Sequence, residues 1–343
     1  VEHKRLRIAP MATLLSSSPV VQVTSRPFAP PRGRRSAALA SCRVATRCDS
    51  STSALEPAEL AGAHAKPAVL SRRAALLAVV LGSSVGFVDA APADAAVLSS
   101  PDDGVVLVVG ATGATGRRVV AQLRAKGVAV RAGSRDIKKA QGLGLASGGA
   151  ELVQLDVLDP ASIARAMAGV TAVVCATGFT PSFKFKTDNP AQVDHKGTDN
   201  LVAAATAEGS TVKKFVLVTS LLVNAKAVGQ KDNDNYKFLN ALGGVLDEKL
   251  AAELNLRKSG LDYTIVRPGG LSNEPASAVG NLILRGEDTT FGLPTDPGRE
   301  ISRDTVAAVC VEALFAAAAS ERVVEIVSSP DAPVLPVETW FAA

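Results

Sequence analysis

The sequence predicts an α/β fold in which helices cover both faces of a doubly wound parallel sheet. After Asp103, short apolar runs alternate with amphipathic stretches of helical length, which is the pattern of strands and crossover helices in a parallel sheet. The same part of the chain contains neither an internal repeat nor a linker. We therefore expect one domain over residues 104–335.

Seven short apolar runs are predicted to be strands. They are rich in Val, Ile and Leu, as expected for strands that are buried on both faces. In chain order they cover residues 105–109, 128–132, 151–155, 172–175, 214–218, 263–266 and 323–327. The amphipathic stretches between them predict helices over residues 116–126, 160–168, 194–207 and 247–258.

The N-terminal region has the composition of an organelle transit peptide, which we place over residues 1–70. From Met11 to about residue 55 it is rich in Ser, Ala and Arg, and Asp49 is its only acid. Residues 1–10 precede Met11, a plausible initiator, and need not be translated. The alternative is an N-terminal tail without a targeting role.

A second signal follows over residues 71–96. Arg72 and Arg73 precede an apolar run over residues 74–88, which is short for a membrane span but suits the hydrophobic part of a signal peptide. Together the two segments resemble the bipartite, twin-arginine leader of thylakoid-lumen proteins. We expect a chloroplast protein in the thylakoid lumen or associated with the thylakoid. The alternatives are a stromal protein with an accidental apolar stretch, and a segment that gives peripheral association with the membrane.

The formal net charge of +4 does not predict a nucleic-acid partner. The excess of Lys and Arg lies in the first 96 residues, and the rest of the chain has slightly more acids than bases. No basic stripe with interleaved aromatic residues is left there to contact phosphates. Because the cysteines fit neither a metal-binding nor a disulfide pattern, we also expect no metal site; they are Cys42, Cys48, Cys175 and Cys310.

A glycine-rich turn joins the first predicted strand to the first helix. Three glycines are spaced G-x-x-G-x-x-G there, where missing side chains allow the backbone to approach a pyrophosphate and the helix N-terminus favours its charge. Two threonines add hydroxyl donors. The sequence therefore predicts a dinucleotide site at Gly110, Thr112, Gly113, Ala114, Thr115 and Gly116.

The end of the second strand indicates NADP(H) rather than NAD(H). An acid that would bind the ribose 2′-hydroxyl is missing there, and Arg135 takes its place. A guanidinium pairs bidentately with a 2′-phosphate, and Arg117 is expected to close from the other side. The alternative is that Arg117, Arg118 and Arg135 are solvated surface charges.

Two further segments occur in the order that a dinucleotide site requires. Asp156, followed by Val157, comes just past the third strand, where a carboxylate can accept a hydrogen bond from the adenine amine. The small residues Ala176, Thr177 and Gly178 end the fourth strand and leave room for the cofactor at the carboxyl edge of the sheet. Both segments have plainer explanations, a helix cap and a turn.

The motifs together resemble those of the atypical short-chain dehydrogenases/reductases, within the group of NmrA-like and plastid sugar-epimerase-like proteins. The matching stretches are GATGATGR, LDVLD, AVVCATG, VDHKGTDNLVAAA, KKFVLVTSLLV, SGLDYTIVRPGGL and ISRDTVAAVCVEAL. The resemblance spans nearly all of residues 105–330. It implies a Rossmann-fold NAD(P)-binding domain with a small C-terminal substrate lobe after Pro268. Pro268 itself would turn the chain over the nicotinamide end of the cleft and so contact the cofactor.

By the same resemblance, Ser220 and Lys249 take the positions of catalytic residues. In catalytic members a Tyr-x-x-x-Lys pair completes the site, with the lysine binding the nicotinamide ribose and lowering the tyrosine pKa. Here the position four residues before Lys249 is Val245, so the usual proton relay is absent. Other titratable residues within range are better explained by structural roles; they are His195, Tyr236, Asp247 and Glu248.

Two functions remain open from the sequence. The first is an NADPH-dependent oxidoreductase that acts on a small plastid molecule. The second is a non-catalytic NADP(H)-binding scaffold or redox sensor that assists a thylakoid protein complex, which the missing tyrosine favours. A sugar-nucleotide epimerase is disfavoured because it needs tightly held NAD and the same tyrosine.

Overall fold

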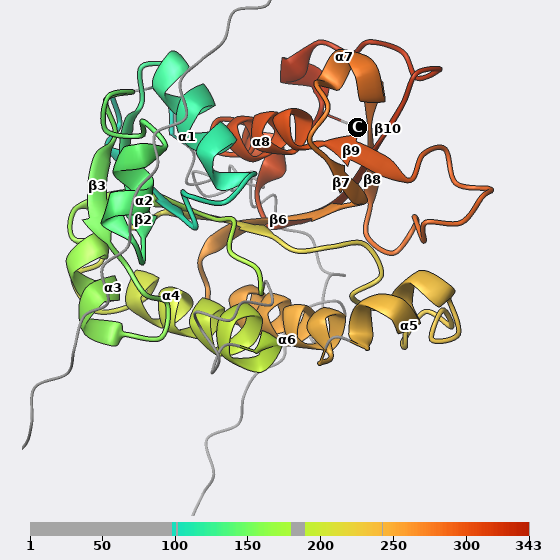
Figure 1. Cartoon of the computed structure of the whole chain (residues 1–343), viewed down its shortest axis with the longest axis horizontal. Helices are drawn as coiled ribbons and strands as arrows, with labels where there is room; N and C mark the ends of the chain where they lie inside the picture. The colour runs from blue at the N-terminus through green and yellow to red at the C-terminus, as the bar shows by residue number, and fades with distance from the viewer. Residues whose placement is uncertain (1–97, 101, 180–188, 242, 343) are drawn as a thin grey trace, which may run out of the picture. The chain divides into compact units, whose positions relative to one another are not determined.

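Eight strands form one sheet in the order β3-β2-β1-β4-β5-β6-β10-β8 (Figure 1). The structure is a computed structural model, which describes residues 98–100, 102–179, 189–241 and 243–342. Neighbouring strands are parallel except for β8, which pairs antiparallel with β10. The strands are β1 (Val105–Val109), β2 (Ala129–Ser134), β3 (Glu151–Gln154), β4 (Val170–Cys175), β5 (Lys214–Val218), β6 (Asp262–Pro268), β8 (Asn281–Gly286) and β10 (Arg322–Ser329). The two predicted targeting segments lie outside the described residues.

Helices pack on both faces of the sheet, which confirms the predicted doubly wound α/β fold. Helices α1 (Gly116–Ala125), α2 (Ile137–Gly142) and α8 (Arg303–Glu312) contribute to the core on one face. The other core receives side chains from α3 (Pro160–Met167), α4 (Gly197–Ala205) and α6 (Val245–Lys258). Figure 1 shows α1 and α8 together on one side of the strands, with α3, α4 and α6 on the other.

Strand β1 shows why its sequence is an unbroken apolar run. Val106 and Val108 point into one core, whereas Leu107 and Val109 point into the other. All four side chains are at most 1% exposed. Burial of such a side chain contributes about 1.5–3 kcal/mol, so a polar residue at any of these positions would destabilise the centre of the sheet.

The helix predicted over residues 194–207 differs in shape from the expectation. It starts earlier, as a π-helical turn (η1, Ala191–Lys196), and continues as α4. Gly197 stands at the junction, where an added Cβ would lie 3.0 Å from Cβ of Val157. The close approach of the helix to the loop after β3 therefore requires glycine at this position.

The segment after Pro268 forms a small lobe, as the resemblance implied. It contains a two-stranded parallel sheet of β7 (Gly270–Ser272) and β9 (Glu300–Ser302) and the short helix α7 (Ala276–Val279), while β8, which follows α7 in the chain, joins the main sheet. The remaining elements of the described chain are α5 (Asp234–Asn240), η2 (Ala317–Ala319) and η3 (Val337–Thr339). Within the described residues, no helix has the length and apolar character needed to cross a membrane.

A buried ionic cluster ties this lobe to the sheet. The guanidinium of Arg267, at the end of β6, is fully buried and donates to Glu253 of α6 at 2.6 Å and to Asp288 at 2.8 Å. Glu287 accepts at 3.0 Å and Glu325 of β10 at 3.5 Å. Glu325 also accepts the backbone N–H groups of residues 288–290 at 2.7–2.9 Å. One arginine thus joins α6, β6, β10 and the turn after β8.

Candidate functional site

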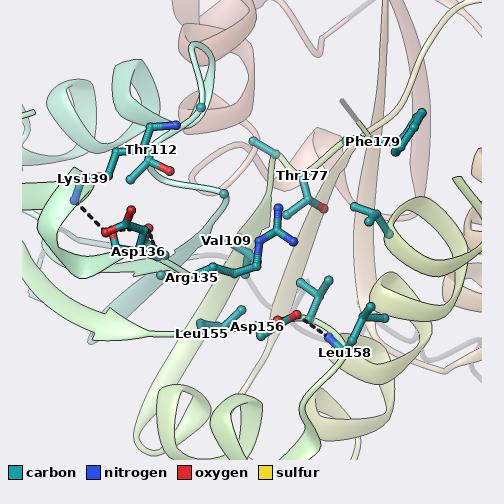
Figure 2. A pocket seen from close by; sticks show the side chains of 18 residues that line it. Val109, Thr112, Arg135, Asp136, Lys139, Leu155, Asp156, Leu158, Thr177 and Phe179 are labelled. Carbon is teal, nitrogen blue, oxygen red and sulfur yellow. Dashed lines mark hydrogen bonds between the residues drawn. The ribbon is translucent and has the colours of Figure 1, made fainter. Parts of the chain in front are cut away.

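A cavity of about 400 Å³ opens at the carboxyl ends of β1 to β4. Its walls come from the loops that follow these strands, and Figure 2 shows the side chains that line it. Ligands bind at this edge in open parallel sheets, near the point where the strand order reverses. That point lies here between β1 and β4, which are neighbours in the sheet order. The cavity is therefore the candidate binding site.

The glycine-rich turn forms one wall of the cavity. Gly110, Thr112 and Gly113 line it, and Gly110 has a φ of +78°, which favours a residue without a side chain. Ala114, Thr115 and Gly116 lie behind these residues and are not part of the lining. An added Cβ on Gly116 would lie 2.9 Å from the carbonyl carbon of Gly110, so this glycine allows α1 to start directly against β1.

The bare turn fits the pyrophosphate of a dinucleotide. An added Cβ on the exposed Gly113 would lie 3.1 Å from the carbonyl oxygen of Gly110, a tight contact that glycine avoids while it leaves this wall without a side chain. Helix α1 begins three residues later, and its N-terminus attracts negative charge. The turn thus presents backbone rather than side chains to this part of the cavity.

The end of β2 provides the basic part of the cavity. Arg135 extends toward the middle of the cavity in Figure 2, with Asp136 and Lys139 at one side. The carboxylate of Asp136 accepts a hydrogen bond from the backbone N–H of Lys139 at 2.9 Å and caps α2. Lys139 was not predicted from the sequence as a site residue. The signal that could have identified it is the capping aspartate three residues before it. Arg117, in contrast, is exposed on α1 and does not line the cavity, so the structure does not bring it together with Arg135.

Asp156 and Val157 line the cavity beyond Arg135. Oδ1 of Asp156 accepts a hydrogen bond from the backbone N–H of Leu158 at 3.0 Å. The carbonyl of Val157 accepts from the side-chain amide of Asn200 in α4 at 2.9 Å. These two bonds fix the loop after β3, so the carboxylate is held at the wall of the cavity where the adenine contact is expected.

The far end of the cavity is formed by the loop that follows β4. Ala176, Thr177, Gly178 and Phe179 line this end, and Figure 2 shows Phe179 on the opposite side from Lys139. Lys249 is not part of the lining, but an added Cβ on Gly178 would lie 3.8 Å from its ammonium nitrogen. The lysine therefore sits directly behind the loop.

Ser220 and Pro268 lie beyond the cavity, after β5 and at the end of β6. Ser220 is half-buried and Pro268 is buried. The neighbouring Thr219 donates to Glu253 at 2.6 Å, and the carbonyl of Pro268 accepts from the N–H of Leu221 at 3.0 Å. Both residues thus belong to segments that the strands and α6 fix firmly, beside the C-terminal lobe.

The other titratable residues considered from the sequence are engaged elsewhere. His195 lies between Glu248 at 2.8 Å and Asp199 at 3.3 Å. The phenol of Tyr236 donates to Asp247 at 2.7 Å. None of these side chains lines the cavity, which agrees with the structural roles preferred from the sequence. Val245 opens α6 one turn before Lys249.

The two tyrosines of the chain give a direct prediction. Burial raises the pKa of both Tyr236 and Tyr263, and at Tyr236 the hydrogen bond to Asp247 raises the pKa further. We expect the midpoint of tyrosinate formation to lie above the pKa of free tyrosine, about 10. Because the unfolded chain ionises first, stability is full below that pH and falls as the pH rises through the folded pKa. An alkaline absorbance titration alongside unfolding curves measures both effects.

The variant Tyr263→Phe isolates the signal of Tyr236. Adding Asp247→Asn should lower the remaining pKa part of the way, because the amide carries no negative charge. Ionisation of Tyr236 at the free-tyrosine pKa in the single variant would contradict the buried, hydrogen-bonded phenol.

Comparisons with known proteins agree with the geometry of the cavity. A family model described as NAD(P)H-binding matches residues 110–317. An uncharacterised chloroplastic protein of Arabidopsis thaliana is 46% identical over 240 residues, which cover 69% of this chain and 81% of that protein. The chloroplastic protein TIC 62 of Pisum sativum is 34% identical over 257 residues, which cover 70% of this chain but only 46% of its own length.

An enzyme and a solved structure extend the comparison. Sanguinarine reductase of Eschscholzia californica is 32% identical over 262 residues, which cover 66% of this chain and 89% of the enzyme. A Bacillus halodurans structure described as an NAD-dependent epimerase/dehydratase superposes with a TM-score of 0.56 at 27% identity, covering 70% of this chain and 99% of its own. The chain therefore belongs to the NAD(P)H-binding family of Rossmann-fold proteins, whose members include reductases and chloroplastic proteins.

Proposed function

We propose that the chain binds NADP(H) along the carboxyl edge of its sheet and works as a plastid oxidoreductase on a small molecule. One observation carries the choice of NADP(H): Arg135 and Lys139 both line the cavity after β2, and the acid between them, Asp136, which lines the cavity as well, is engaged through Oδ1 as the cap of α2. Two cations beside the ribose position complement a 2′-phosphate, whereas NAD(H) recognition uses an acid that accepts from the ribose hydroxyls.

The residues present fit each part of such a cofactor. The glycine turn would receive the pyrophosphate, Asp156 would contact the adenine, and the loop of Ala176 to Phe179 would border the nicotinamide end. When bound, the reduced nicotinamide supplies a hydride. The chain itself binds and orients, because Val245 stands where a proton-donating phenol would be needed.

Replacing Arg135 tests the cofactor choice. In the full-length chain, Arg135→Glu should raise the Kd for NADPH about 10- to 100-fold, the loss of a charge-assisted contact worth about 1.5–3 kcal/mol. The Kd for NADH should change little. The matched control is Arg117→Glu, which makes the same charge change on an exposed residue outside the cavity. Fluorescence titrations with both nucleotides measure these values, and an equal loss for NADPH and NADH would refute the 2′-phosphate contact.

A second candidate function is a non-catalytic NADP(H)-dependent scaffold or redox sensor for a thylakoid protein complex. Val245 in place of the tyrosine supports it. Following NADPH absorbance with a panel of carbonyl, enone and quinone compounds separates the two candidates. Oxidation of NADPH by one of these compounds supports the oxidoreductase, whereas tight binding without oxidation supports the scaffold.

A chloroplast location is part of the proposal. The Ser- and Arg-rich leader supports it, as do relatives described as chloroplastic. The twin arginines and the apolar run over residues 74–88 support the thylakoid within it. Import into isolated chloroplasts, followed by separation of stroma, membrane and lumen, tests both statements.

A further inference from the structure

Asp194 is a buried carboxylate with two partners at the far end of the cavity. Its side chain is fully buried. Oδ1 accepts from the ammonium of Lys249 at 2.7 Å, and Oδ2 accepts from the backbone N–H of Phe179 at 3.1 Å. One side chain thus joins the π-helical turn η1, helix α6 and the loop that follows β4.

These partners place Asp194 directly behind the wall of the cavity. An added Cβ on Gly178 would lie 3.8 Å from both Oδ1 of Asp194 and the nitrogen of Lys249. Gly178, Phe179 and the preceding residue of the turn, Val193, all line the cavity. A π-helical turn within a helix is uncommon and often occurs at functional sites. Here it brings the carboxylate to the loop.

The ion pair gives Lys249 a partner that the sequence did not reveal. With Val245 four residues before it, the ammonium has no phenol on which to act. Burying a carboxylate costs several kcal/mol unless a counter-charge and hydrogen bonds compensate it, and Asp194 has both. Removal of its charge would therefore release the lysine and the backbone of Phe179 together.

We propose that Asp194 is a positioning residue for the nicotinamide half of the cofactor. It holds Lys249 and the amide of Phe179 in place, and so fixes the end of the cavity opposite Arg135. The adenosine half, near Arg135, Lys139 and Asp156, does not depend on it. This inference rests on the proposed binding of NADP(H).

The test compares the whole cofactor with a fragment of it. In the full-length chain, Asp194→Asn should raise the Kd for NADPH at least about tenfold and reduce the fluorescence change of bound NADPH, since one buried charged hydrogen bond is worth about 1.5–3 kcal/mol. The Kd for 2′,5′-ADP, which lacks the nicotinamide half, should stay within about twofold. Lys249→Met should show the same pattern. Because the two residues act as a pair, the Kd of the double variant for NADPH should be no higher than that of the weaker-binding single variant.

Asp199→Asn is the matched control. Asp199 also connects α4 to α6, through Asn255 at 2.8 Å, but does not line or back the cavity loop. We expect it to leave both Kd values unchanged. An equal effect of Asp194→Asn on NADPH and 2′,5′-ADP, no effect at all, or the same effect from Asp199→Asn would each overturn the proposal.

Amide exchange separates this inference from the proposed function. If Asp194 holds the loop, Asp194→Asn accelerates hydrogen exchange at the N–H of Phe179 in the protein without nucleotide, and Asp199→Asn does not. A wild-type chain that binds neither NADPH nor 2′,5′-ADP would refute the proposed function. Unchanged exchange at Phe179 would refute the positioning role whatever the nucleotide affinity.

Discussion

Replacing Arg267 by methionine is expected to lower the free energy of unfolding by about 3–5 kcal/mol, the loss that follows when one partner of a buried ion pair is removed. Glu253 is fully buried and Glu325 is 2% exposed, so both carboxylates would lose their buried counter-ion. A domain of ordinary stability has about 5–15 kcal/mol in total. Urea unfolding measures the change, with the m-value as a check on the unfolded state.

The loss in Arg267→Met should depend on pH. Burial already raises the pKa of Glu325 in the native protein, although three backbone N–H groups and Arg267 oppose the shift. Without Arg267, the pKa of Glu325 in the folded protein should rise further above its value in the unfolded chain. The folded variant therefore favours the protonated form of this carboxyl. The contribution of Glu325 to stability is full below its unfolded pKa and is lost as the pH rises through its folded pKa. The deficit relative to wild type should therefore be smaller at about pH 5 than at about pH 8.

Arg257→Met is the control for this prediction. Arg257 contacts Glu253 and Glu287 at the rim of the same cluster, but a quarter of its side chain is exposed. Its removal should cost about 1 kcal/mol or less, as for partly solvated ion pairs. Equal losses in the two variants would show that burial of Arg267 is not what makes it important.

Replacing Gly116 by alanine is expected to abolish tight NADPH binding and to destabilise the domain by about 1–3 kcal/mol, the usual cost of overpacking. Alanine favours a helix over glycine by up to about 1 kcal/mol, so propensity alone predicts the opposite sign. Sterics decide, because the added Cβ would overlap the carbonyl of Gly110 and lie 3.1 Å from Cα of Ala111. These atoms are backbone and cannot rotate away, so the turn that would hold the pyrophosphate must open.

Gly142→Ala provides the matched comparison. Gly142 ends α2, and an added Cβ there meets no atom within 4 Å, so this variant should be as stable as wild type or slightly more so. Thermal unfolding and NADPH titration of both variants measure the difference. A Gly116→Ala protein that binds NADPH with wild-type affinity would contradict the close packing of α1 on β1.

The central part of the fold could be predicted because its signals are local. β1 is an apolar run of five residues and β5 is Lys214 followed by four apolar residues, and the structure has both strands at the predicted positions. β8 was missed because it is an antiparallel edge strand with a mixed sequence, NLILRG. β7 and β9 have three residues each, which is too short for periodicity to appear.

The same distinction applies to the candidate site. The glycine turn and Arg135 were predictable because each belongs to a short motif beside a strand. The role of Asp194 was not, since its partner Lys249 is 55 residues away and the contact depends on a π-helical turn. The cluster around Arg267 likewise joins residues that only the sheet order brings together.

The segment between Thr290 and Arg299 is held at both ends by hydrogen bonds of its main chain. The N–H of Thr290 donates to Glu325 at 2.7 Å, and the carbonyl of Arg299 accepts from the N–H of Gly270 at 2.8 Å. Main-chain anchors do not depend on which side chains lie between them. Loops of this kind tolerate changes of sequence better than the elements they connect. The exposed residues of this loop on the C-terminal lobe can therefore change without loss of either anchor, whereas Phe291, Asp296 and Gly298 are held by contacts of their own.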